Sequence, residues 1–208
     1  MLFRDRIAAT KPLVFALCLL PFAHLVWDAM HGTLGPDPVA QLEHRSGDWA
    51  LRLLLATLAI TPLRKLTGWH KLIRFRRMLG LFAFFYVSVH LLIYLFVDLG
   101  GYWADIFEQI AKKPYITVGF AAWLLLIPLA LTSTQAMMRR LGRNWQRLHR
   151  VAYLIALLGV LHYFWLVKAD HREPALYLCI WIVLMLARLR VRSRPADELR
   201  RVAARLKI

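Results

Sequence analysis

Four of the eight histidines lie in or at the ends of long apolar runs, where an ionisable side chain is costly and usually functional. These are His24, His90, His149 and His162. The other four fall between the runs, where we expect solvated or interfacial side chains: His31, His44, His70 and His171. Two imidazoles that face each other at one depth between helices are typical of heme iron coordination. The depth of each histidine therefore decides which chemistry it can perform.

Depth can be counted along a helix from the basic residues that precede each run. His90 is 13 residues beyond Arg77, and His162 is 12 residues beyond Arg150. At the helical rise these spacings place both histidines about 18–20 Å from the basic edge. We therefore predict that His90 and His162 are the axial ligands of one low-spin heme b in the outer half of a membrane. Gly159 lies one turn before His162, where a missing side chain would let a porphyrin edge approach the backbone.

Two alternatives to this ligand pair stay open. His24 is 13 residues beyond Lys11, so its depth matches as well, although Pro21 is expected to bend that helix. The two deep histidines could also be core residues that bond neighbouring carbonyl groups.

His149 belongs to a different level, because it is flanked by arginines at the basic edge. On an ideal helix it lies about 140° around from His162, whereas Arg76 lies within about 40° of the face of His90. An inner site lined by Arg76 and His149 would suit an anionic group: a flavin phosphate (FMN), a quinone or the propionates of a second heme. Two further arginines border this site, Arg74 and Arg77. The alternative is that these charges serve only to fix the membrane topology.

The composition defines the elements that must hold these residues. The chain has 208 residues, 60% of them hydrophobic, and a net charge of +16. Its mean hydropathy is +0.50. This excludes a disordered chain or an ordinary soluble domain, and the bilayer explains the basic residues better than nucleic acid does. We predict an all-α integral membrane protein, a bundle of six transmembrane helices at about 12–27, 49–63, 78–97, 115–134, 151–167 and 175–189.

Charge asymmetry predicts the orientation of this bundle. The N-terminus, the second and fourth connections and the tail together hold 22 basic and 3 acidic residues, a net charge of +19. The remaining segments carry a net charge of −3. The positive-inside rule then places both termini in the cytoplasm and requires an even number of spans. The connections contain no phosphate-binding or dinucleotide-binding glycine motif, so we expect another protein to supply any nucleotide chemistry.

Several motifs resemble a known family. The first group, similar to the ferric-reductase-like transmembrane domain, is Ile-Thr-Pro-Leu-Arg at 60–64 and Ile-Arg-Phe-Arg-Arg-Met-Leu-Gly-Leu at 73–81, followed by His90. The second group, similar to the MsrQ (YedZ) family, is His31–Pro38, Leu131–Met137, Trp145–His149 and His162–Lys168. The resemblance covers nearly all of residues 1–208, which we take as a single domain.

The resemblance implies a function. It implies the heme b subunit of a bacterial inner-membrane system that passes electrons to MsrP, a periplasmic molybdopterin enzyme that reduces methionine sulfoxide in proteins. FMN and quinone are associated with such subunits, and the family's histidines fall on His90, His149 and His162. The wider superfamily often has a second histidine low on the third helix, and this chain has Arg76 there.

Three functional classes remain for comparison. The first is a b-type cytochrome that takes electrons from quinol or from a cytoplasmic flavin reductase and acts as an electron-transfer subunit, within the MsrP system or as a generic ferric-reductase-like carrier. The second is a transporter that uses intramembrane His and Arg, and the third is an anchor subunit without heme. His90 lies in an apolar stretch, Phe82–Phe96, with no polar stripe leading to it, which favours the cytochrome.

Overall fold

A computed structural model describes the backbone of residues 2–205 and the side chains of residues 10–189. These residues form helices and short connections with no strand among them, which confirms the predicted all-α class. The α-helices are α1 (Leu2–His31), α2 (Pro38–Thr67), α3 (Ile73–Ile93), α4 (Trp103–Lys112), α5 (Pro114–Leu131), α6 (Gln135–Leu141), α7 (Arg143–Leu148), α8 (Ala152–Leu166) and α9 (Arg172–Arg205). Three short helical turns join them: η1 (His70–Leu72), the π-helical η2 (Tyr94–Asp98) and η3 (His149–Val151).

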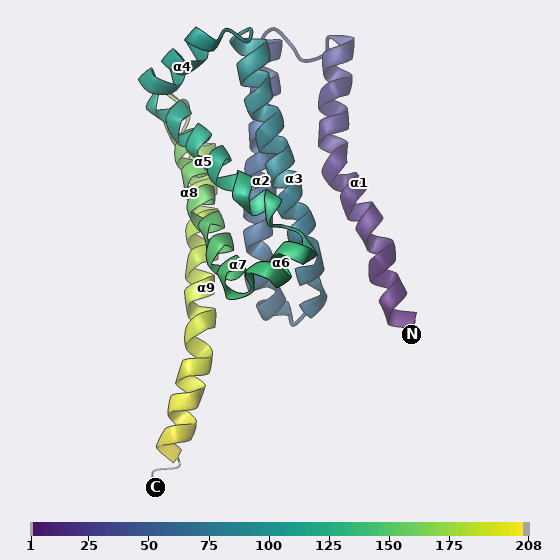
Figure 1. Cartoon of the computed structure of the whole chain (residues 1–208), viewed down its shortest axis with the longest axis vertical. Coiled ribbons are helices and arrows are strands. Elements are labelled where there is room, and N and C mark those ends of the chain that lie inside the picture. The colour runs from purple at the N-terminus through teal and green to yellow at the C-terminus, as the bar shows by residue number, and fades with distance from the viewer. Residues whose placement is uncertain (1, 206–208) are drawn as a thin grey trace.

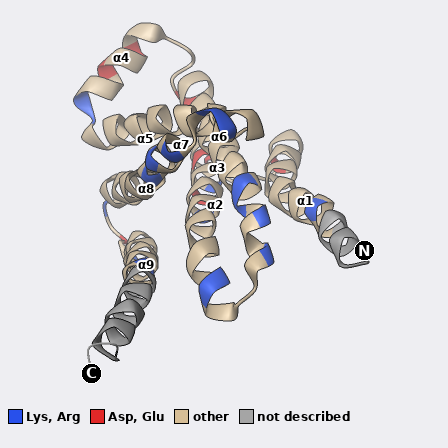
Figure 2. Cartoon of the chain, turned by 60° about the horizontal axis from the view of Figure 1, so that its bottom comes forward, with Lys and Arg blue, Asp and Glu red and all other residues tan. Residues whose placement is uncertain are grey.

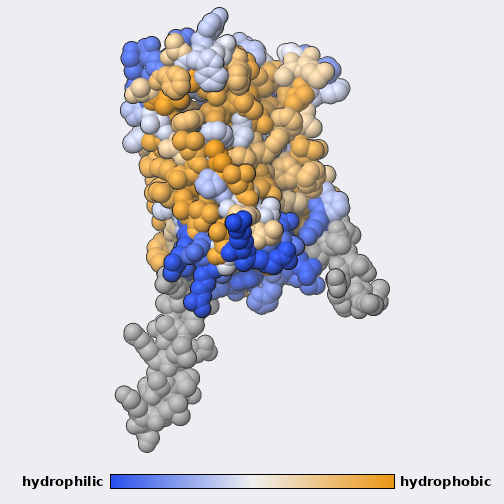
Figure 3. All heavy atoms as spheres, in the orientation of Figure 1, coloured by the Kyte–Doolittle hydropathy of each residue, from blue (hydrophilic) through white to orange (hydrophobic). Residues whose placement is uncertain are grey.

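Four helical stretches in the described part are long and apolar enough to cross a membrane: Thr10–His31, His70–Asp98, Pro114–Leu131 and Arg143–Leu166. They correspond to the first, third, fourth and fifth predicted spans. The second and sixth predicted spans, 49–63 and 175–189, lie inside the longer helices α2 and α9. The surface has a broad apolar band between two polar rims (Figure 3). The protein is therefore a multi-pass membrane protein.

The core is formed by α2, α3, α5 and α8, with α2 packed along α3 and α5 along α8 (Figure 1). The helix α3 also contacts α5, and α9 packs against α2 and α8. Side chains such as Leu58, Ala83, Tyr86, Ile155 and Val160 are fully buried between these helices. The helices therefore hold residues distant in sequence at fixed mutual depth.

Helix α1 is attached at the side of this core through a bend (Figure 1). Pro21 interrupts its hydrogen bonding. The buried hydroxyl of Tyr86 on α3 inserts there, accepting from the Phe22 amide at 2.9 Å and donating to the Cys18 carbonyl at 2.8 Å. Tyr86 therefore pairs backbone groups that the helix itself leaves open.

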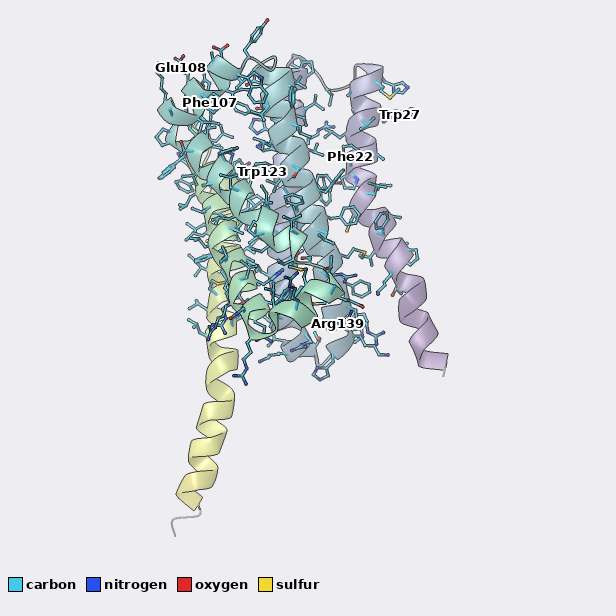
Figure 4. The ribbon with its side chains drawn as sticks, viewed as in Figure 1. Phe22, Trp27, Phe107, Glu108, Trp123 and Arg139 are labelled. Carbon is cyan, nitrogen blue, oxygen red and sulfur yellow. The ribbon has the colours of Figure 1, made fainter. Side chains whose placement is uncertain are left out.

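The two ends of the bundle differ in charge (Figure 2). We call the end that carries α4 the outer end and the end that carries η1, α6 and α7 the inner end. Glu108 on α4 and Arg139 on α6 mark these opposite ends (Figure 4). Acidic side chains lie toward the outer end of the described part, and most basic ones toward the inner end. The terminal basic residues used for the predicted orientation, such as Arg4, Arg6 and Arg190–Lys207, lie outside the described side chains.

Candidate functional site

A cavity of about 260 Å³ lies between α2, α3, α5 and α8. His90 of α3 and His162 of α8 both line it, so the two histidines predicted to be level share one site. Gly159 also lines this cavity. Trp123 of α5 (Figure 4) also lines the cavity, and its indole N–H donates to the Ser88 hydroxyl of α3 at 3.1 Å.

Each of the two histidines is held by a backbone carbonyl on a neighbouring helix. Nδ1 of His90 lies 3.0 Å from the carbonyl oxygen of Glu43 on α2. Nδ1 of His162 lies 2.7 Å from the carbonyl oxygen of Tyr115 on α5. A carbonyl only accepts, so each Nδ1 carries the proton. This leaves Nε2 of each ring as the lone-pair nitrogen, which is how metal-binding histidines are usually oriented.

The spacing of the rings matches a shared metal. Their centroids are 6.2 Å apart and their planes are inclined by 78°. A metal–nitrogen bond is about 2 Å long, and each nitrogen lies roughly 1 Å from its ring centre. Two rings that bind one metal from opposite sides would therefore have centroids about 6 Å apart. His90 and His162 would together hold such a metal and leave a substrate no place on it, so these residues would suit a group that supplies electron transfer.

Two glycines that the sequence reasoning missed make room for these rings. A Cβ on Gly119 of α5 would lie 2.7 Å from Nδ1 of His162, closer than atoms can approach. A Cβ on Gly47 of α2 would lie 3.3 Å from the ring of His90. At Gly159 an added Cβ would meet only Leu51, at an ordinary 3.5 Å. The sequence gives no signal for Gly47 or Gly119, because the helix that carries the facing histidine cannot be inferred from either glycine's neighbours in the chain.

His149 lies apart from this cavity, near the inner end. Its Nε2 is 3.1 Å from the Thr132 hydroxyl, and its ring stacks on Trp145 with centroids 4.0 Å apart. Trp145 in turn donates to the Thr132 carbonyl at 3.0 Å. The turn η3 interrupts the α-helical phase between His149 and His162.

Basic side chains surround His149 unequally. Arg76 is half-buried and close enough to act electrostatically on His149, whereas Arg74 and Arg77 are exposed. Arg188 of α9, which the sequence reasoning assigned to topology alone, turns into the bundle. It donates to the Tyr153 hydroxyl and the Leu58 carbonyl, its guanidinium lies over the Tyr153 ring, and its Nε is buried without a partner.

The rival histidine lies elsewhere. His24 on α1 does not line the cavity among the described residues, and its side chain is 69% exposed. Its Nδ1 is 3.2 Å from Asp28, which also accepts from Arg45 at 2.5 Å and from Thr33 at 2.8 Å. His24 therefore belongs to a polar cluster that ties the outer end of α1 to α2.

Comparison with known proteins identifies the family. Residues 46–160, more than half of the chain, match the family model described as ferric reductase like transmembrane component. A relative from Xanthomonas axonopodis pv. citri, described as the protein-methionine-sulfoxide reductase heme-binding subunit MsrQ, is 63% identical over 185 residues, 86% of this chain and 85% of its own length. The chain belongs to the MsrQ family. A relative of the same description from Caulobacter vibrioides is 48% identical over 187 residues, 89% of each chain.

These matches confirm the resemblance predicted from the motifs. Gly47, His90, Gly119 and His149 fall within the matched ferric-reductase-like region, and His162 lies two residues beyond its end. No solved structure matches the chain.

Proposed function

We propose that this MsrQ-family protein is a membrane b-type cytochrome that carries electrons across the bacterial inner membrane as a subunit of a methionine sulfoxide reductase system. The observation that carries the proposal is the His90–His162 pair. Both rings have Nδ1 committed to a backbone carbonyl, and their centroids are separated by 6.2 Å. The relatives' description as heme-binding subunits supports the same cofactor. Heme, when bound, supplies one-electron redox chemistry.

We infer a topology of six spans with both termini in the cytoplasm. The basic inner end of the bundle supports this orientation through the positive-inside rule. On that basis His90 and His162 lie nearer the periplasmic face. Electrons would leave toward the outer end, where Asp98, Asp105 and Glu108 give an acidic surface. The acceptor we propose is MsrP, a periplasmic molybdopterin enzyme, in line with the methionine sulfoxide reductase named for the relatives.

We propose that electrons enter through the inner site at His149. Arg76, His149 and Arg188 bring positive charge and hydrogen-bond donors to one region, and no described acidic side chain lies at the inner end. Such a region suits a flavin phosphate, a quinone carbonyl or the propionates of a second heme. The donor would be the quinone pool or a cytoplasmic flavin reductase, because the described fold contains no nucleotide-binding domain. Arg74 and Arg77, being exposed, would attract an anionic donor from solution.

Reconstituted electron transfer tests this function. The purified protein in lipid nanodiscs is reduced with quinol or with a flavin reductase, then mixed with MsrP and a methionine sulfoxide peptide. We expect a reducible Soret band that reoxidises only when MsrP and the sulfoxide are both present. A colourless protein, or a reduced band that MsrP leaves unchanged, would contradict the proposal.

A further inference from the structure

The cavity that holds His90 and His162 is polarised along the axis of the bundle. Its inner half is apolar and is lined by Leu51, Leu54, Ala122, Leu126 and Ile155. The polar residues of its lining are gathered toward the outer end, where they lie among apolar side chains such as Leu95 and Ile116: Glu43, His44, Asp48, Tyr94, Asp98, Lys113 and Tyr115. A ligand with one apolar edge and one polar edge would match this lining.

Two buried polar atoms at the outer half have no hydrogen-bond partner among the described residues, the Tyr94 hydroxyl and Oε1 of Glu43. Tyr94 follows His90 by four residues and begins the π-helical turn η2. An unpaired buried hydroxyl costs about 1–3 kcal/mol, and in native proteins such groups usually meet a ligand or water. The Tyr94 hydroxyl is therefore available as a donor to a ligand in the cavity.

Lys113 brings a positive charge to the same end. It lies between α4 and α5, lines the cavity and forms no ion pair in the described part of the chain. The neighbouring Lys112 differs, because its ammonium group donates to Glu108 at 2.6 Å and it does not line the cavity. That hydrogen bond lowers the pKa of the Glu108 carboxyl below its usual range. Two adjacent lysines thus have different roles.

We propose that the outer half of the cavity binds the two propionates of the heme, with the Tyr94 hydroxyl and the Lys113 ammonium group as donors. This inference rests on the proposed function, because it takes heme as the ligand. A porphyrin has two carboxylates on one edge and apolar substituents on the opposite edge, which matches the polarity of the cavity. The propionates then face the periplasmic side, and the apolar edge faces the inner site.

Carboxyl groups near this edge make the lysine necessary. Asp48 is paired with Arg52 at 3.1 Å, and Asp98 is exposed, where solvent screens it. Glu43 remains close to the cavity without a partner for Oε1. Two propionates brought to this acidic end need a cation, and Lys113, which forms no ion pair among the described residues, lines it.

The test measures each lysine variant with two ligands that differ only in their carboxylates. Lys113→Gln and the matched control Lys112→Gln are reconstituted with heme b or with its dimethyl ester, in which both carboxylates are neutral. Heme dissociation rate and midpoint potential are measured for each combination. For heme b we expect Lys113→Gln to speed heme dissociation about tenfold, because one charge-assisted hydrogen bond is lost. The midpoint potential should fall, because a positive charge near the heme is removed. Tyr94→Phe should cause a smaller change in the same direction.

With the dimethyl ester, Lys113→Gln should match the wild type, and Lys112→Gln should match it with either ligand. The assignment of the propionates would be overturned if both lysine substitutions changed the dissociation rate and potential of heme b equally. It would also be overturned if Lys113→Gln had the same effect with the ester as with heme b. A wild-type protein that takes up no heme would overturn the proposed function and this inference with it. The wild-type arm therefore separates the two failures.

Discussion

A methyl group on Gly119 would lie 2.7 Å from Nδ1 of His162, at the nitrogen that donates to the Tyr115 carbonyl. The absence of a side chain at Gly119 therefore determines where the His162 ring lies. Gly119→Ala should push the ring away and weaken heme binding by about 1–3 kcal/mol, the usual cost of overpacking. The measurement is heme bound per chain after purification.

Gly80→Ala provides the matched control for this prediction. It places the same methyl group in α3, where the nearest atom, on Thr57, is 3.6 Å away. Heme content should then stay at the wild-type level. Equal heme loss in both variants would mean that glycine replacement harms the bundle generally.

Tyr86→Phe tests the attachment of α1. The substitution leaves the Phe22 amide and the Cys18 carbonyl without the hydroxyl that joins them beside Pro21. We expect a loss of about 1–3 kcal/mol in the free energy of unfolding. Thermal unfolding in detergent measures it, and heme content in the folded fraction should not change. An unchanged unfolding temperature would show that α1 does not depend on this contact.

His149→Ala tests the inner site. The imidazole contacts Thr132 and Trp145 and lies away from the cavity that holds His90 and His162. The variant should keep the outer heme but accept electrons from quinol or reduced flavin at least several-fold more slowly, as stopped-flow absorption would record. Reduction at the wild-type rate would place electron entry elsewhere. Loss of half of a two-heme complement would identify the inner group as a second heme.

The outer acidic surface should guide the partner. Asp105→Lys with Glu108→Lys on α4 reverses two exposed charges, and we expect slower electron transfer to MsrP, with the difference from wild type shrinking as salt is raised. Arg139→Glu, at the opposite end of the bundle, is the control and should leave this rate unchanged (Figure 4). Sensitivity to Arg139→Glu alone would reverse the proposed direction.

Helical periodicity explains how much of this site the sequence could predict. His90 and His162 were predicted to be level because depth on a helix depends only on residue count from the basic edge. The carbonyl acceptors and the glycines could not be predicted, because Glu43, Gly47, Tyr115 and Gly119 lie on other helices and the helix pairing is not encoded locally. His24 remained a rival for the same reason, since equal depth does not reveal which face meets the cavity.

The inner end was predicted less completely. His149 was expected to lie off the face of His162, and among the described residues it does not line the cavity that His162 lines. Arg188 was counted among the topology charges, but its long side chain reaches Leu58 and Tyr153 once α9 packs on the core. The amphipathic helix α4 was not predicted, because a ten-residue segment in a loop carries no span-length signal.

The central claim is that His90 and His162 bind one heme between them. The most direct measurement is the absorption and electron paramagnetic resonance spectrum of His90→Ala and of His162→Ala, with heme quantified per protein chain. The account predicts a low-spin bis-histidine signal in the wild type, lost or converted to high spin in each variant, and unchanged in the controls His24→Ala and His171→Ala. A wild-type low-spin spectrum at full heme occupancy in both variants, or its loss in His24→Ala instead, would contradict it.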